Sequence, residues 1–158
     1  MQFYTTVMRR EDIDQVLAIE KVSFSSPWER QAFENELANP NAHGIVVKEK
    51  KIGQIERVVA YVCFRCVTDK IHIVNIAVLP EYRRRGIGTG LLQAVIAEAR
   101  QQLCAEIVLE VRLTNQSAVL FYKKLGFKVV GKLSEYYSES GEDSLIMSFP
   151  HNSKIRKE

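Results

Sequence analysis

Hydrophobic residues near the start of the chain change their spacing once, from a short apolar run to a helical repeat. The run covers residues 3–7, and apolar side chains then recur near a helical period over residues 13–19. This pattern predicts a strand followed by a first amphipathic helix that ends near Val22.

A second helix is expected to start at Ser26-Pro27. Ser26 is a suitable N-cap, Pro27 suits the first helical position, and Glu29 stands three residues after the cap, as in a capping box. Asn-Pro-Asn at 39–41 breaks the repeat and should end this helix.

From Gly44 onwards the pattern becomes that of β-strands joined by short polar links, which favour antiparallel neighbours. The predicted strands cover 45–47, 58–62, 71–78, 107–111, 127–130 and 145–147, and the predicted helices cover 91–103 and 115–125.

The predicted order of elements is β-α-α-β-β-β-α-β-α-β-β, which indicates an α/β (α+β) fold. Its central sheet should be mixed and mostly antiparallel, with about seven strands, helices on both faces and a βαβ crossover at its centre. We expect residues 1–150 to form a single domain and 151–158 to be a polar, disordered tail.

Composition narrows the class of protein without indicating its activity. The 158 residues are 46% hydrophobic and 26% charged, as in an ordinary globular protein. No apolar run approaches the ~20 residues that span a bilayer, so no membrane association is expected. A net charge of +3 is too small to indicate a nucleic-acid partner. Three cysteines suggest no secreted disulfide framework, which favours the cytoplasm.

No metal site is expected. Cys63 and Cys66 lie three residues apart in a predicted strand, so their side chains should point to opposite faces and could not close on one metal ion. His43, His72 and His151 show no ligand spacing. We therefore interpret the two cysteines as packing residues.

The segment 76–92 carries the most chemistry, because a strand, a loop rich in arginine and glycine and a helix start follow one another. N–H groups at a helix N-terminus lack intrahelical partners, and glycines let an anion approach the main chain. The glycines at 86, 88 and 90 fit neither a Walker loop nor a dinucleotide fingerprint. A glycine turn with a solvated basic face is the alternative to a phosphate site.

Arg83-Arg84-Arg85-Gly86-Ile87-Gly88 resembles the (Q/R)-x-x-G-x-(G/A) acyl-CoA loop of the GNAT N-acetyltransferases. Further segments, in the family's order, resemble its RimI branch, the ribosomal-protein alanine N-acetyltransferases. These segments are 24–28, 109–112, Asn115, 120–127, 136–137 and 142–143.

The resemblance implies the GNAT fold and acetyl-CoA as cosubstrate, with no metal. The cofactor would be held by backbone groups of the strand, by N–H groups of the loop and by one side chain. In chain order these residues are Ile76, Ala77 and Val78 for the pantetheine arm, Arg84, Arg85, Gly86, Ile87, Gly88 and Thr89 for the pyrophosphate, and Asn115.

The resemblance also implies two catalytic residues. Glu110 matches the general base, acting directly or through one water if partial burial raises the pKa of its carboxylate. Tyr122 matches the general acid, which protonates the departing thiolate. From the residues alone, Glu110 could instead face solvent or pair with Arg112, and Tyr122 could be a packed helix tyrosine.

Four aromatic residues are candidates for binding the acceptor. In RimI-like enzymes, the segment that contains Phe24 and Trp28 and the loop that contains Tyr136 and Tyr137 flank the peptide entrance. The alternatives are a hydrophobic anchor for the first pair and ordinary strand aromatics for the second.

The leading hypothesis is acetyl transfer from acetyl-CoA to the α-amino group of a protein N-terminus, with ribosomal protein S18 as the candidate acceptor. An α-amino group, with a pKa near ~8, is partly neutral at cytoplasmic pH, whereas lysine, near ~10.4, is mostly protonated. Alternatives are transfer to a lysine side chain or a small amine, and a non-catalytic module that binds CoA or nucleic acid.

Overall fold

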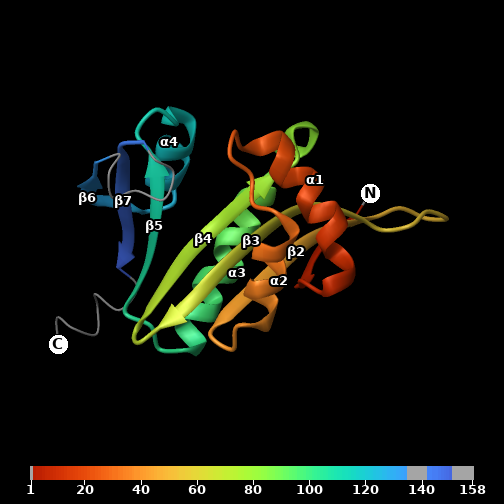
Figure 1. Cartoon of the computed structure of the whole chain (residues 1–158), viewed down its shortest axis with the longest axis horizontal. Helices are drawn as coiled ribbons and strands as arrows, with labels where there is room; N and C mark the ends of the chain where they lie inside the picture. The colour runs from red at the N-terminus through yellow and green to blue at the C-terminus, as the bar shows by residue number, and fades with distance from the viewer. Residues whose placement is uncertain (1, 135–141, 151–158) are drawn as a thin grey trace. The chain divides into compact units, whose positions relative to one another are not determined.

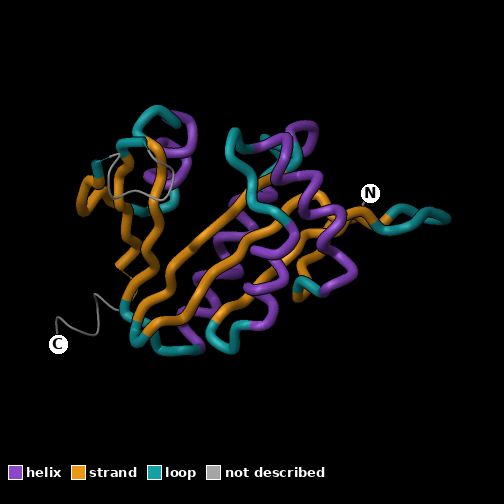
Figure 2. The backbone as a smooth tube through the Cα atoms, viewed as in Figure 1, coloured by secondary structure: helices purple, strands orange, loops and turns teal. Residues whose placement is uncertain are grey.

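The computed structural model describes residues 2–134 and 142–150, so Tyr136, Tyr137 and the predicted tail 151–158 lie outside the described residues. Its elements follow the predicted order (Figures 1 and 2). The strands are β1 Gln2–Val7, β2 Ala42–Lys50, β3 Arg57–Val67, β4 Lys70–Val78, β5 Glu106–Arg112, β6 Lys128–Leu133 and β7 Ser144–Pro150. The helices are α1 Ile13–Ser23, α2 Arg30–Ala38, α3 Ile87–Gln101 and α4 Gln116–Lys124, with 3-10 turns at Arg10–Asp12 and Pro80–Tyr82.

The strands form a seven-stranded sheet in the order β1-β2-β3-β4-β5-β7-β6. The pairs β1–β2, β2–β3, β5–β7 and β6–β7 are antiparallel, whereas β4 and β5 are parallel and are connected through α3. The mixed, mostly antiparallel sheet and its βαβ crossover are therefore confirmed.

The chain divides into two compact units, each built from two stretches of sequence. Residues 1–65 and 75–95 form the first unit, and residues 66–74 and 96–158 the second. We describe each unit by itself, and the expectation of a single domain over 1–150 stays a prediction.

In the first unit, α1 and α2 lie on one face of the strands and α3 lies on the other (Figure 1). The ring of Phe33 in α2 is buried between Trp28, at a centroid distance of 5.1 Å, and Tyr61 of β3, at 5.8 Å. A core of this kind is what the helical spacing of apolar residues requires, because each helix must bury its apolar face.

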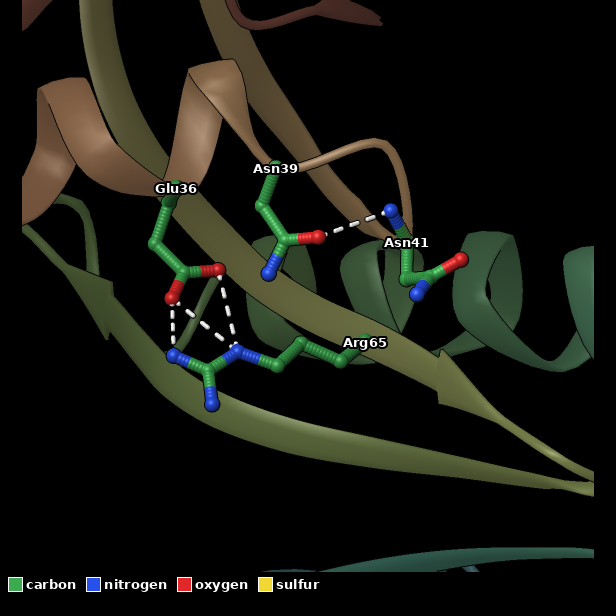
Figure 3. A network of polar contacts seen from close by, with 4 residues as sticks. All are labelled: Glu36, Asn39, Asn41 and Arg65. Atoms are coloured by element: carbon green, nitrogen blue, oxygen red, sulfur yellow. Dashed lines mark hydrogen bonds and ion pairs between the residues drawn. The ribbon is translucent and has the colours of Figure 1, made fainter.

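A partly buried ion pair connects α2 to β3 in this unit. The carboxylate of Glu36 accepts three hydrogen bonds from the guanidinium of Arg65, two of them from Nε at 3.0 and 3.4 Å (Figure 3). Glu36 is only 7% exposed, so its hydrogen bonds to Arg65 offset the cost of burying the carboxylate.

A local hydrogen bond shapes the link that follows α2, where Oδ1 of Asn39 accepts the N–H of Asn41 at 2.9 Å (Figure 3).

The predicted start of the second helix is wrong. α2 begins at Arg30 with Glu29 as its N-cap, and no side chain caps it. The N–H of Trp28, which a cap at Ser26 would have bound, instead donates to Oε2 of Glu20 at 2.8 Å. Residues 24–29 therefore form a connection outside the helices rather than a first helical turn.

In the second unit, β5 pairs with β7, and an aromatic cluster packs beside α4. Phe127 is buried between Tyr122, at a ring-centroid distance of 5.7 Å, and Phe149 of β7, at 5.4 Å. Gly126 ends the helix as predicted, with a φ of 104° that favours glycine, and a Cβ there would lie 3.0 Å from the Phe149 ring.

None of the three cysteines, all of which lie within the described residues, forms a disulfide. Cys63 and Cys66 lie on β3, with Cys63 buried and Cys66 half-buried, and Cys104 is buried in the link after α3. Burial raises the pKa of all three thiols, which keeps them protonated and poorly reactive.

Candidate functional site

The loop between β4 and α3, in the first unit, is fixed where it leaves β4 by two hydrogen bonds. The N–H of Leu79, directly after β4, donates to the carbonyl of Val59 in β3 at 2.9 Å. Nε of Arg83 donates to the carbonyl of Val78 at 3.0 Å. The chain therefore enters the loop from a defined strand end.

The backbone of this loop turns sharply just before α3. Arg84 has a φ of 64° and Gly86 a φ of 79°, and the left-handed conformation costs a residue with a Cβ roughly 1–2 kcal/mol. The carbonyl of Gly86 accepts the N–H of Gly90 at 3.0 Å and so begins the hydrogen-bond ladder of α3.

This geometry leaves N–H groups without helical partners at the N-terminus of α3. Because the ladder begins at the Gly90 N–H, the N–H groups of Ile87, Gly88 and Thr89 have no acceptor within the helix. They lie at the positive end of the helix dipole, directly after three arginines. The residues predicted to bind the pyrophosphate are thus consecutive in the chain and combine N–H donors with positive charge, which are the groups that a phosphate requires.

The ring of Tyr82 contacts this loop through Arg85. It is 6% exposed, and its hydroxyl donates to Oε1 of Glu49 in β2 at 2.6 Å. The guanidinium of Arg85 lies 5.0 Å from the centre of its ring, and that of Arg57 lies 5.6 Å from it. The sequence predicted a basic loop but not this aromatic support, which a tyrosine three residues before Arg85 could have suggested.

The strand segment predicted to bind the pantetheine arm is the end of β4. The parallel register of β4 with β5 ends at the pair Ile73↔Leu109, whereas β4 continues to Val78. Within this segment Ala77 is buried, and Ile76 and Val78 are half-buried.

Glu110 lies in the middle of β5, in the second unit, opposite Ile146 of β7. Its side chain is exposed, whereas those of Leu109 and Val111 on either side are buried. From the sequence, a role of Glu110 as general base is linked to partial burial of its carboxylate. The structure does not show this burial. As an exposed carboxylate, Glu110 has direct access to water.

The end of β5 is tied to the start of β7. Arg112 forms an ion pair with Glu142 at 3.4 Å, and the N–H of Leu113 donates to the carbonyl of Asp143 at 2.9 Å. These contacts involve the acidic pair predicted from the family resemblance and show it next to β5.

Asn115 caps α4. Its Oδ1 accepts the N–H of Ala118 at 3.2 Å, so the helix starts one residue later than predicted. A cofactor contact predicted for this residue would therefore have to use its Nδ2, because Oδ1 already stabilises the helix.

Tyr122 lies in α4 and is 8% exposed. Burial raises its pKa to about 12, so the phenol stays protonated at neutral pH. A protonated phenol is the form that a general acid requires, although the raised pKa weakens it as a donor in the free protein.

Phe24 and Trp28 lie on the connection between α1 and α2. Both are half-buried, and the residues between them are exposed. Trp28 packs its ring on Phe33, and its main-chain N–H donates to Glu20, a buried carboxylate that sequence reasoning missed. The signal was present, since Glu20 follows Val16 by four residues and so shares its buried face.

The candidate residues fall in both units. The loop 84–89, the segment 76–78, Phe24 and Trp28 lie in the first, and Glu110, Asn115 and Tyr122 in the second. Among the residues that the structure describes, no group of three or more metal-ligating side chains lies close enough together to hold a metal ion. None of the described helices combines the length and hydropathy needed to cross a membrane.

Comparison with known proteins gives consistent similarities. The sequence model of the acetyltransferase (GNAT) family matches residues 13–127. The chain is 40% identical to a Bacillus subtilis protein named provisionally as a ribosomal protein bS18-alanine N-acetyltransferase, with 89% of this chain and 90% of that protein covered. It is 36% identical to an N-alpha-acetyltransferase of Sulfurisphaera tokodaii, with 90% and 89% covered.

A solved structure shows the same fold. The crystal structure of the ribosomal-protein-S18-alanine N-acetyltransferase from Escherichia coli superposes with a TM-score of 0.81 at 27% sequence identity. The match covers 94% of each chain.

Proposed function

The chain belongs to the acetyltransferase (GNAT) family and is an acyltransferase, and we propose that it moves an acetyl group from acetyl-CoA to the α-amino group of a protein N-terminus. The observation that carries the proposal is the turn at Arg84–Gly86, which leads into α3 and presents three N–H groups without intrahelical partners. Relatives named as N-terminal acetyltransferases support the choice of acceptor.

In this proposal the loop and the strand end bind the cofactor. The N–H groups of residues 84–89 hold the pyrophosphate, and the arginines add attraction for a polyanionic ligand. Backbone groups of residues 76–78 bind the pantetheine arm as an added strand, which is consistent with a β4–β5 register that ends at Ile73.

Glu110 and Tyr122 carry the proton transfers. The exposed carboxylate of Glu110 accepts the proton of the acceptor ammonium, directly or through a water, so that the neutral amine attacks the thioester carbonyl. The C–N bond forms, the C–S bond breaks, and Tyr122 donates a proton to the departing thiolate. No acyl-enzyme is formed.

The proposed acceptor is the N-terminus of ribosomal protein S18. The Bacillus and Escherichia proteins are named for this acceptor, whereas the Sulfurisphaera relative carries the broader name of an N-alpha-acetyltransferase. Phe24 and Trp28 are proposed to line the acceptor entrance, and the predictions for Tyr136 and Tyr137 lie outside the described residues. We propose that the enzyme acts in the cytoplasm, where cysteines such as Cys63, Cys66 and Cys104 stay as thiols rather than disulfides.

A peptide panel tests the acceptor. A peptide with the N-terminal sequence of S18 should be acetylated when its α-amine is free and not when it is blocked, even if it contains an internal lysine. Acetylation of the blocked peptide would favour a lysine acceptor. A raised melting temperature with acetyl-CoA, without turnover of any amine, would favour a non-catalytic CoA module.

Two variants test the mechanism. Glu110→Gln and Tyr122→Phe should each lower kcat by about 10²-fold or more, the range of general acid–base catalysis. Glu106→Gln is the matched control, since Glu106 lies on the same strand but forms an ion pair with Lys70 at 3.1 Å. Wild-type turnover in both Glu110→Gln and Tyr122→Phe would contradict the assigned roles.

A further inference from the structure

Glu20 is the most deeply buried carboxylate that the proposed mechanism does not use. It lies near the end of α1 and is 1% exposed. Burying a carboxylate costs several kcal/mol unless hydrogen bonds compensate it. A carboxyl group buried in this way needs a structural or functional reason.

Three neutral donors, from β3, β4 and the connection between α1 and α2, converge on this carboxylate. The hydroxyl of Tyr61 in β3 and Nδ2 of Asn75 in β4 both donate to Oε1, the second at 2.8 Å. The main-chain N–H of Trp28 donates to Oε2 at 2.8 Å. Burial and the nearby Glu20 charge raise the pKa of Tyr61, so its hydroxyl stays protonated and donates.

The same residue holds both ends of the connection between α1 and α2. The main-chain carbonyl of Glu20 accepts the N–H of Phe24 at 3.1 Å, and its side chain accepts the N–H of Trp28. Between these anchors, Ser25, Ser26 and Pro27 are exposed. We call residues 24–28 the anchored segment.

The anchor also links this segment to the cofactor strand. Asn75 directly precedes Ile76–Val78, the residues proposed to bind the pantetheine arm. One carboxylate therefore contacts, through two hydrogen bonds, both the segment proposed for the acceptor and the strand proposed for the cofactor.

We propose that Glu20 is a positioning residue for the acceptor: its carboxylate fixes the anchored segment, and through Phe24 and Trp28 it sets the affinity for the acceptor N-terminus. Glu20 acts through that segment and does not touch the substrate. The inference rests on the proposed function, since it assigns the acceptor to this segment.

The test is Glu20→Gln in the full chain. Both oxygens of the Glu20 carboxylate accept hydrogen bonds. Whichever way the glutamine amide turns, its NH2 group therefore faces a donor and loses the hydrogen bond that the carboxylate oxygen accepted. The KM for the N-terminal peptide should rise on the order of tenfold, as expected when a hydrogen bond to a charged group is lost, while kcat stays near the wild-type value. The melting-temperature shift caused by acetyl-CoA should not change.

Trp28 provides a readout that is independent of activity, because it is the only tryptophan of the chain. Its emission should shift in Glu20→Gln. The matched control is Glu36→Gln, which removes another buried carboxylate of the same unit, one that binds Arg65 and not the anchored segment (Figure 3). This control should lower stability and change neither KM nor Trp28 emission.

The outcomes separate the two proposals. If the wild-type protein fails to acetylate N-terminal peptides, the proposed function fails, and Trp28 emission still tests the anchor. Wild-type KM and emission in Glu20→Gln, a raised KM without a change in emission, or equal effects of Glu36→Gln would each overturn the positioning role. Should Glu20→Gln not fold, Tyr61→Phe removes one donor and should change KM and emission in the same direction, by less.

Discussion

The guanidinium of Arg85 lies 5.0 Å from the centre of the Tyr82 ring, and a second guanidinium, from Arg57, lies 5.6 Å from the same ring. Only Arg85 belongs to the loop that leads into α3. A cation–π contact of this kind is worth about 0.5–1 kcal/mol at exposed sites, enough to bias the position of the side chain.

Replacing Arg85 should therefore weaken cofactor binding specifically. Arg85→Ala removes a cation held beside the proposed pyrophosphate site, and the Kd for CoA should rise on the order of tenfold. Arg57→Ala, which loses the same type of ring contact outside the loop, should leave the Kd nearly unchanged. Titration calorimetry measures both, and equal effects would show that the ring contact rather than the loop charge matters.

Two glycines of the same region should respond in opposite ways. Gly86 has a φ of 79°, so Gly86→Ala should destabilise the protein by about 1–2 kcal/mol and weaken CoA binding. Gly90 lies within α3, and a Cβ there would meet no atom within 4 Å. Gly90→Ala should stabilise the protein by about 0.5–1 kcal/mol. Denaturant unfolding of both variants measures the difference, and a stabilised Gly86→Ala would contradict the assigned backbone role.

Substitutions of Asn115 can separate helix capping from a cofactor contact. Asn115→Ala removes the bond from the Ala118 N–H and should cost about 1 kcal/mol of stability. Asn115→Ser retains a capping oxygen but lacks the amide donor, so stability should stay close to wild type. If Asn115 also binds the cofactor, both variants should weaken CoA binding. Normal binding in Asn115→Ser would leave the residue with a capping role alone.

Stability should fall in alkaline solution because of buried phenols. Burial raises the pKa of Tyr122 to about 12, whereas an unfolded tyrosine titrates near 10. The unfolded state therefore binds fewer protons between these values, so the contribution is fully present below pH 10 and is lost as the pH rises towards 12.

Tyr122→Phe should lessen this alkaline loss. A shift of about two pKa units corresponds to about 2–3 kcal/mol, which the variant no longer loses at high pH. Tyr61, whose pKa is also raised by burial, contributes a loss in the same direction and remains in the variant. Urea unfolding at pH 9 and above pH 11 tests this expectation, and an equal loss of stability in wild type and variant would contradict it.

The order of elements could be predicted because it depends on local patterns, whereas α3 starts at Ile87, four residues before the predicted helix at 91–103. Glycine spacing after β4, which ends at Val78 just before Pro80, indicates a turn into a helix, and the structure has one. Apolar alternation around Glu110 likewise indicates that this side chain faces away from the buried Leu109 and Val111.

The start of α2 could not be predicted, because a contact outside the local sequence decides it. Ser26, Pro27 and Glu29 carry every local signal of an N-cap. The carboxylate of Glu20 nevertheless binds the Trp28 N–H from the preceding helix, with Tyr61 and Asn75 as its other donors. Hydrogen-bond partners from two strands that are distant in sequence cannot be predicted from a local pattern of residues.

Neither compact unit is a continuous piece of chain. The first unit consists of residues 1–65 and 75–95. The residues between these two stretches, 66–74, belong to the second unit. During synthesis the first unit cannot be completed before residue 95 has left the ribosome, and the segment 66–74 must then wait for residues 96 onwards. No single cut of the backbone can release either unit intact, so truncated forms that end between residues 65 and 95 should be unfolded and rapidly degraded.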